Sequence, residues 1–141
     1  MQIKQIYTPD SGFSIQLPYF MTSIQAGFPS PADDFVDTKL DLNEYLIKHP
    51  AATFFVRVSG DSMIGAGIYD NDILIVDRSL DARPEMIIVA ALDGELTVKR
   101  LKKKNDTVIL SPENDQYEPI VVSEESDFSV WGVVTAVIHK P

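Results

Sequence analysis

The sequence predicts a compact, mainly β domain of short strands with one short helix, preceded by an extended amino-terminal arm. From residue 53 onward, short runs rich in β-branched and aromatic residues alternate with turn residues. In residues 1–38, by contrast, Gly12, Gly27 and four prolines interrupt every longer periodic pattern. The chain has 141 residues, which is enough for one domain with a real core but not comfortably enough for two.

The amino-terminal arm is expected to span residues 1–38 and the main domain residues 39–141. Residues 13–17 alternate between apolar and polar side chains, as a strand would. Pro29 and Pro31 each push the preceding residue toward extended backbone, so this part of the arm cannot be helical. We therefore interpret the arm as an extended segment with little core of its own.

A short helix is expected to follow the arm. Asp41 suits its N-cap, and Glu44 sits at the reciprocal position of a capping box. Leu42 and Tyr45 belong to one apolar face, and Pro50 stops the helix.

Seven strands are expected after the helix. They are the runs 53–58, 73–77, 86–92, 95–101, 108–110, 120–122 and 130–138. Asp93-Gly94 lies between two of these runs and is typical of a two-residue hairpin turn. Seven short strands with a single helix predict one mainly β domain.

Composition excludes several classes of function. The formal net charge of -9 repels phosphate backbones, so we expect no direct sequence-specific binding of nucleic acid. The absence of cysteine excludes disulfides, thiolate catalysis and cysteine-ligated zinc, and two histidines leave little for a metal site, so we expect no metal and no cofactor. With no signal peptide and no run of about 18 apolar residues, the expectation is a soluble cytoplasmic protein.

A candidate nucleophile lies where the first strand of the domain ends. Residues 54–58 run directly into Ser59-Gly60-Asp61-Ser62-Met63. Such a junction presents a hydroxyl together with main-chain N–H groups, which can stabilise an oxyanion if residues 64–67 form a helical turn. Taken alone, the segment is better explained as a polar loop, because glycine-serine turns are common.

A nucleophilic serine needs a base. His49 precedes a proline and His139 lies two residues from the end of the sequence, so both are expected on the surface. A lysine can serve if it is neutral, which requires its pKa to fall by roughly 2–4 from a reference value near 10.4. Burial lowers the pKa of a lysine, because desolvation disfavours the ammonium form.

Lys99 is the candidate base. It lies within a predicted strand, where Thr97, Lys99 and Leu101 share one face. The opposing interpretation is a solvated face, because Lys99 begins a basic run that continues to residue 104. Periodicity alone does not single out Lys99.

Three motifs in order resemble those of the LexA/UmuD family of serine–lysine autopeptidases. Residues 59–63, 67–68 and 70–77 resemble the nucleophile segment, and residues 95–101 resemble the lysine segment. Upstream, Ala26-Gly27-Phe28-Pro29-Ser30-Pro31-Ala32 is similar to the cleavage site of the UmuD branch. Residues 40–43, 49–53 and 131–134 match further parts of that branch, so the resemblance covers nearly all of the chain from residue 24 onward.

The resemblance implies a LexA-like catalytic domain and a role for each site residue. Ser62 would be the nucleophile, Lys99 the general base, and the N–H groups of Ser62 and Met63 the oxyanion donors. The cleaved bond would join Ala26 to Gly27. From the local sequence alone, a flexible glycine hinge explains Ala26-Gly27 equally well. Ser59 is the alternative nucleophile, but it lacks the methionine that follows the family's serine.

The resemblance also implies partners. Members of the UmuD branch cut themselves when the RecA–single-stranded DNA filament binds them. The trimmed homodimer then joins a UmuC-like Y-family DNA polymerase for error-prone translesion synthesis in the SOS response. The LexA repressors carry an amino-terminal DNA-binding domain, whereas about 38 residues precede the helix here, without a helix-turn-helix pattern.

Two other classes of function stay open from sequence. One is a non-catalytic interaction module that regulates a DNA polymerase and has a vestigial Ser–Lys pair. The other is a protease that acts on other proteins, as signal peptidases do. No membrane anchor supports the second class, and a cleavage-like sequence in the same chain favours cutting of self.

Overall fold

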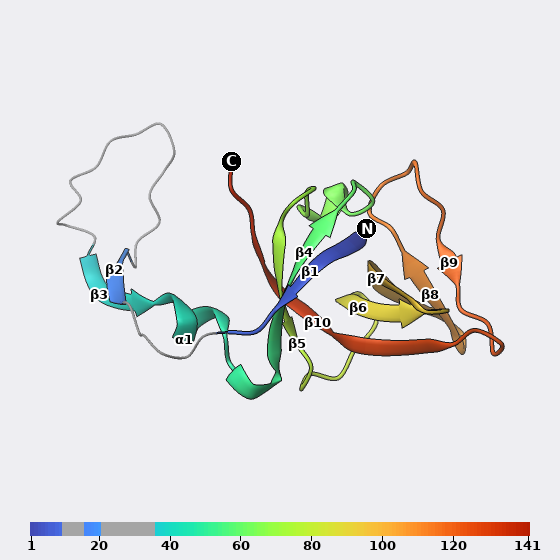
Figure 1. Cartoon of the computed structure of the whole chain (residues 1–141), viewed down its shortest axis with the longest axis horizontal. Helices are drawn as coiled ribbons and strands as arrows, with labels where there is room; N and C mark the ends of the chain where they lie inside the picture. Colours follow the sequence, from blue (N-terminus) through green and yellow to red (C-terminus); the bar gives the residue numbers. More distant parts are fainter. Residues whose placement is uncertain (10–15, 21–35) are drawn as a thin grey trace. The chain divides into compact units, whose positions relative to one another are not determined.

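The computed structural model describes residues 1–9, 16–20 and 36–141 (Figure 1). The chain divides into two units: Met1–Pro9 with His49–Pro141, and Asp10–Lys48. This division differs from the boundary expected between residues 38 and 39, because the first nine residues belong to the large unit. Strands dominate the described residues and one short α-helix is present, which confirms the predicted fold class.

The smaller unit contains a two-stranded sheet and the predicted helix. Strand β2 (Gln16–Phe20) pairs antiparallel with β3 (Val36–Asp41). Helix α1 (Leu42–Leu46) follows directly, and the Asp41 carboxylate accepts the main-chain N–H of Asn43 at 3.0 Å, as expected of an N-cap. The predicted cleavage site at Ala26 and Gly27 lies outside the described residues.

The large unit contains all seven strands predicted after the helix. Two short 3₁₀ turns accompany them, η2 (Pro50–Ala52) and η3 (Ile64–Ala66). The strands are β4 (Thr53–Ser59), β5 (Ile73–Asp77), β6 (Ile87–Leu92), β7 (Glu95–Lys104), β8 (Thr107–Ser111), β9 (Ile120–Val121) and β10 (Phe128–Ile138).

The main sheet closes on itself as a barrel. Its eight strands follow the order β1-β4-β5-β10-β6-β7-β8-β9, and β1 (Gln2–Tyr7) pairs also with β7, at Gln2 opposite Thr97. Strand β1 therefore lies between β4 and β7 and completes the ring, while β8 and β9 extend the sheet beyond it. Figure 1 shows β1 running alongside β4.

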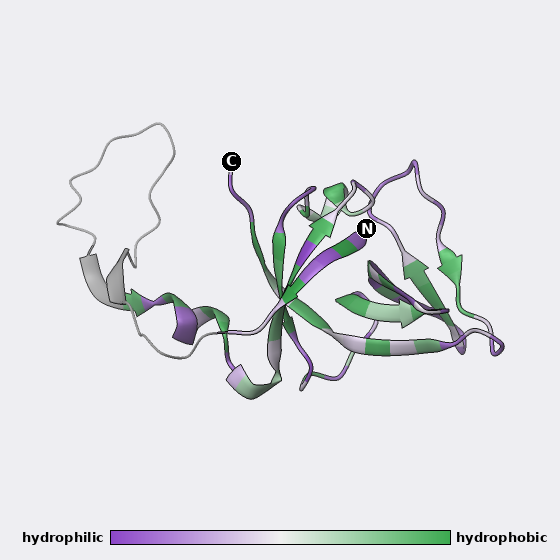
Figure 2. Cartoon of the chain, viewed as in Figure 1, coloured by the Kyte–Doolittle hydropathy of each residue, from purple (hydrophilic) through white to green (hydrophobic). Residues whose placement is uncertain are grey.

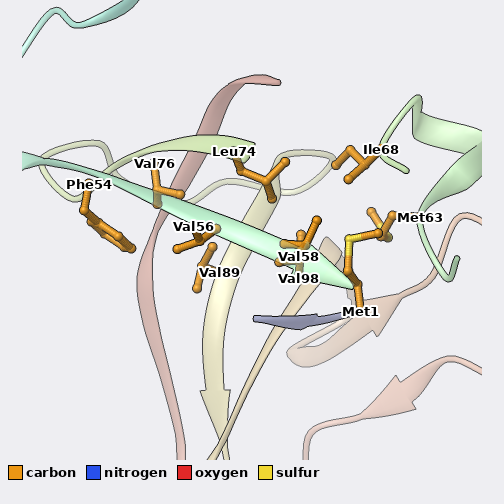
Figure 3. Packing of buried hydrophobic residues seen from close by; sticks show 10 residues of the cluster. All are labelled: Met1, Phe54, Val56, Val58, Met63, Ile68, Leu74, Val76, Val89 and Val98. Carbon is orange, nitrogen blue, oxygen red and sulfur yellow. The ribbon is translucent and has the colours of Figure 1, made fainter. Parts of the chain in front are cut away.

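The core explains why these runs form strands. In β4, Phe54, Val56 and Val58 are buried, and less buried residues alternate with them. Their side chains pack in one cluster with residues of strands that are not their sheet neighbours, Val89 of β6 and Val98 of β7 (Figure 3). Figure 2 shows hydrophobic stretches along several barrel strands, whereas hydrophilic residues occupy much of β1 and many of the connecting turns.

Strand β1 was not predicted. A bulge between Ile3 and Gln5 breaks its pairing with β4, so the apolar residues do not alternate regularly. Met1 is buried and Ile3 packs against the core, whereas Ile6, beyond the bulge, is 48% exposed. Because of the bulge, the sequence of β1 lacks the strict alternation that indicates a strand.

The predicted hairpin brings the candidate base into the barrel. Asp93 (φ 49°) and Gly94 (φ 86°) both have positive φ, as a tight two-residue hairpin requires. The turn sets the register of β6 and β7, in which Ile88 lies opposite Lys99. Lys99 therefore lies on a paired strand inside the sheet, and its side chain is buried.

We expect Gly132→Ala to destabilise the barrel. A Cβ at this position in β10 would lie 2.7 Å from Val76 Cγ1 and 3.0 Å from the Asp77 carbonyl oxygen. Such overpacking lowers the free energy of unfolding by about 1–3 kcal/mol, which denaturant titration measures. Ser129→Ala, at an exposed position of the same strand, is the control. Equal unfolding midpoints for the two variants would contradict the conclusion that the space at Gly132 is too small for a side chain.

Candidate active site

Ser62 lies in a tight turn at the end of β4, here called the serine turn (residues 60–67). Gly60 (φ 98°) redirects the chain, and its N–H donates to Asp70 Oδ1 at 2.9 Å. Turn η3 follows, and Gly67 (φ 80°) ends it, so the helical turn expected at residues 64–67 is present. Met63 is fully buried in the core and anchors the turn.

The structure brings Ser62 and Lys99 together from segments 37 residues apart. Lys99 Nζ lies 3.2 Å from Ser62 Oγ. The side chains are buried, with residue exposures of 1% and 6%. Lys99 Nζ also lies 3.2 Å from the Val98 carbonyl oxygen and 3.3 Å from Thr97 Oγ1, so neutral acceptors surround the amine.

These surroundings favour the neutral form of Lys99. Burial lowers the pKa of Lys99 below its ordinary value of 10.5, and a hydrogen bond with the Met1 amine opposes this effect without cancelling it. Within the described part of the chain, no carboxylate forms an ion pair with Lys99. A buried amine without a counter-charge is suited to accept a proton from Ser62.

Met1 is a site residue that the sequence did not reveal. Its α-amine donates to Ser62 Oγ at 2.7 Å, and its carbonyl oxygen lies 3.4 Å from both Val98 N and Thr97 Oγ1. Burial, together with the neighbouring Lys99 amine, lowers the pKa of the Met1 amine to about 5. No local pattern points to this contact, because it joins residues 61 positions apart.

A loop after β8 holds the serine turn by main-chain contacts. Glu113 N–H donates to the Ser62 carbonyl at 2.8 Å, and Gly65 N–H donates to the Glu113 carbonyl at 2.7 Å. The Asn114 side chain adds a 3.0 Å bond to the Asp61 carbonyl. The Ser62 backbone is therefore fixed by a segment about 50 residues later in the chain, which the sequence did not indicate.

Side chains strengthen this connection. Arg100, the neighbour of Lys99 on β7, forms an ion pair with Glu113. Tyr117 OH donates to the Asp61 carboxylate, and this bond raises the pKa of Tyr117. The loop thus links the strand that carries the candidate base to the turn that carries the candidate nucleophile.

The predicted oxyanion donors are available. In the described residues, the main-chain N–H groups of Ser62 and Met63 donate to no protein acceptor, whereas those of Ile64 and Gly65 are already used. A surface pocket of about 280 Å³, lined in part by Ser59, Asp61 and Ser62, adjoins them. The oxyanion role of these two donors stays a prediction.

The histidines are half-exposed and contact buried aspartates. His49 Nδ1 lies 2.5 Å from Asp77 and His139 Nδ1 lies 2.6 Å from Asp72. Burial alone would raise the pKa of Asp77, but hydrogen bonds from Ser79 and His49 outweigh it and lower that pKa. Neither histidine contacts Ser62 among the described residues, and these residues contain no cluster of histidine and carboxylate side chains that could hold a metal.

The sequence is similar to those of known proteins. The model of the family described as Peptidase S24-like matches residues 18–135. The chain belongs to this family. It is 47% identical over 123 residues to protein SamA of Salmonella typhimurium, a match that covers 87% of this chain and 85% of SamA. Family membership makes the chain a peptidase of the serine kind and confirms the predicted relationship to the LexA/UmuD group.

Two further relatives match over most of their length. Protein ImpA of Escherichia coli is 45% identical over 132 residues, covering 94% of this chain and 90% of ImpA. Protein MucA of Escherichia coli is 41% identical over 126 residues, covering 89% of this chain and 86% of MucA. The similarity therefore extends through the serine turn and the lysine strand together.

We expect Gly65→Ala to disturb the serine turn. Its Cβ would lie 2.6 Å from the Glu113 carbonyl oxygen, so the loop must move away from the turn. We predict a fall in the rate of any Ser62-dependent reaction by on the order of 10²-fold, because a 1 Å misplacement costs about this much. The rate is measured by gel, with thermal unfolding in parallel. Ala66→Gly, one residue along, is the control. A normal rate for Gly65→Ala would contradict the conclusion that the Glu113 main chain holds the serine turn in place.

Proposed function

We propose that the chain is an autopeptidase that cuts itself between Ala26 and Gly27, with Ser62 as nucleophile and Lys99 as general base. The observation that carries this proposal is the 3.2 Å approach of a buried lysine amine to a buried serine hydroxyl. The matching family and the cleavage-like segment at residues 26–32 support cutting of self. Ala26 and Gly27 are both small, so a nucleophile can approach the bond between them closely.

The proposed reaction is acyl transfer. Neutral Lys99 accepts the Ser62 hydroxyl proton, and Ser62 Oγ attacks the Ala26 carbonyl carbon. The N–H groups of Ser62 and Met63 hold the oxyanion that forms. The C–N bond then breaks, and the Gly27 nitrogen leaves with the proton from Lys99. Water hydrolyses the ester, and the products are residues 1–26 and 27–141.

The biological role we propose is that of the UmuD branch. Binding of the RecA–single-stranded DNA filament stimulates cleavage in the cytoplasm, and the trimmed form becomes an accessory subunit of a UmuC-like Y-family polymerase in the SOS response. The strongly acidic composition supports action through protein partners rather than by direct binding of DNA. No helix in the described part of the chain is long and apolar enough to span a membrane. We propose that residues 1–38 form the cleavable arm, whose first strand β1 pairs with the barrel, and that residues 39–141 form the peptidase domain.

We further propose that the chain forms a homodimer. Exposed apolar side chains on two strands support this proposal, because exposed apolar area is typical of interaction surfaces. They are between 36% and 61% exposed and comprise Ile120 and Val121 of β9 and Val130, Trp131, Val137 and Ile138 of β10.

We expect Ser62→Ala to abolish self-cleavage, with a fall of at least about 10³-fold. Ser59→Ala, which removes a hydroxyl three residues away, should be cut like the unaltered chain. The chains are incubated at raised pH, or with RecA, single-stranded DNA and a nucleotide, and the fragments are identified by mass spectrometry. Cleavage of Ser62→Ala at the normal rate would remove Ser62 from the reaction. A complete lack of cleavage, even with the filament, would favour a non-catalytic interaction module.

We expect the cleavage rate to rise with pH and to level off above the lowered pKa of Lys99, because only the neutral amine accepts the Ser62 proton. Lys99→Arg should be inactive throughout, since a guanidinium stays protonated at every accessible pH. Lys102→Arg, at a partly exposed position of β7, is the control. Rates are measured from about pH 6 to about pH 10. A rate that is independent of pH in this range would argue against a lysine base.

A further inference from the structure

Strand β1 occupies a distinctive place in the barrel. It is the strand between β4, which leads into the serine turn, and β7, which carries Lys99. Its pairing with β7 is limited to Gln2 and Thr97. If β1 is removed, the barrel has an open groove whose two edges lead to the two candidate catalytic side chains. An extended peptide is the natural ligand for such strand edges, because main-chain hydrogen bonds provide affinity with little demand on sequence.

We propose that this groove binds the peptide strand on the amine side of a cleaved bond, and that residues 1–7 of the chain occupy it as an intramolecular inhibitor. The proposal rests on the self-cleavage proposed above and assigns a regulation to the same site. Strand β1 must leave before the bond between Ala26 and Gly27 can reach Ser62.

The contacts of Met1 are those of a bound product. In acyl transfer by a serine, the leaving nitrogen departs from the carbon that Oγ has attacked, so the new amine lies beside Oγ. The Met1 amine is in this position, 2.7 Å from Ser62 Oγ. The Met1 carbonyl faces Val98 N and Thr97 Oγ1, each at 3.4 Å, as a strand bound along β7 requires.

The Met1 side chain fills a matching apolar site. It is 8% exposed and belongs to the buried cluster that includes Val58, Met63 and Val98. Figure 3 shows Met1 next to Met63, at the end of β4. An amine, a carbonyl and a side chain are therefore all bound at the position next to Ser62. This arrangement excludes a substrate carbonyl from the same space.

The rest of β1 is paired along its length on one side only, with β4, whereas a single position pairs with β7. Gln2, Lys4 and Gln5 are exposed, and the bulge after Ile3 interrupts the ladder with β4. Segments with few buried contacts open at a low free-energy cost compared with core strands. Displacement of β1 is thus the point of control, and a cut after Ala26 would break the covalent link between β1 and residues 27–141.

The experiment weakens β1 in the full-length chain and measures self-cleavage at raised pH. Ile3→Asp places a charge against the core, and Gln2→Pro removes an N–H from the ladder while leaving the core side chains intact. We expect both variants to be cut faster than the unaltered chain, on the order of tenfold, which corresponds to about 1.4 kcal/mol of lost inhibition. Thr8→Asp, at an exposed position just beyond the strand, adds the same charge as Ile3→Asp and should have no effect.

A synthetic peptide with the sequence of residues 1–7 is then added to Gln2→Pro. With a free amine it should restore slow cleavage. With an acetylated amine it should inhibit at least several-fold less, because the acetyl group adds bulk at the buried position where the Met1 amine lies 2.7 Å from Ser62 Oγ. A purely structural role for β1 predicts lower thermal stability with an unchanged or slower rate. The proposal is overturned if Gln2→Pro is less stable to heat but is cut no faster than the unaltered chain. It is also overturned if the two peptides inhibit equally. If Ser62→Ala is cut as fast as the unaltered chain, the self-cleavage mechanism itself fails, which is a distinct outcome.

Discussion

The burial of one lysine amine against one serine hydroxyl is the constraint on which the rest of the site depends. A charged ammonium in such surroundings would cost several kcal/mol, so Lys99 is held where its neutral form is favoured. A surface lysine at the same distance from a serine would stay protonated and could not accept its proton. The chemistry therefore follows from the packing of the barrel as much as from the identity of the two residues.

Three parts of the large unit maintain this contact. The β6–β7 hairpin sets the register of Lys99. The serine turn is anchored from inside by Met63 and from outside by the Glu113 main chain. Strand β1 covers the site and places a second amine on Ser62. The hairpin and the serine turn position the reacting groups, whereas β1 excludes substrate. Different parts of the fold therefore assemble the site and inhibit it.

Local sequence patterns predicted those structural elements that depend on residues close together in the chain. The seven strands from residue 53 onward, the Asp41 cap and the Asp93-Gly94 hairpin were all predicted, because period, capping and turn chemistry act over a few positions. Strand β1 was missed, since its bulge breaks the period. The loop at residues 112–117 was also missed, because its role consists of main-chain bonds to a distant turn.

The sequence by itself determined the family and the fold class, and it predicted Ser62 and Lys99 for the proposed reaction, because the order of motifs and the type of each residue can be read without coordinates. Only the tertiary structure decided that Lys99 is buried with no carboxylate partner among the described residues, that Glu113 holds the serine turn and that Met1 reaches Ser62. These contacts join residues about 40 to 60 positions apart. Closure of the barrel, which no local pattern encodes, brings such residues together.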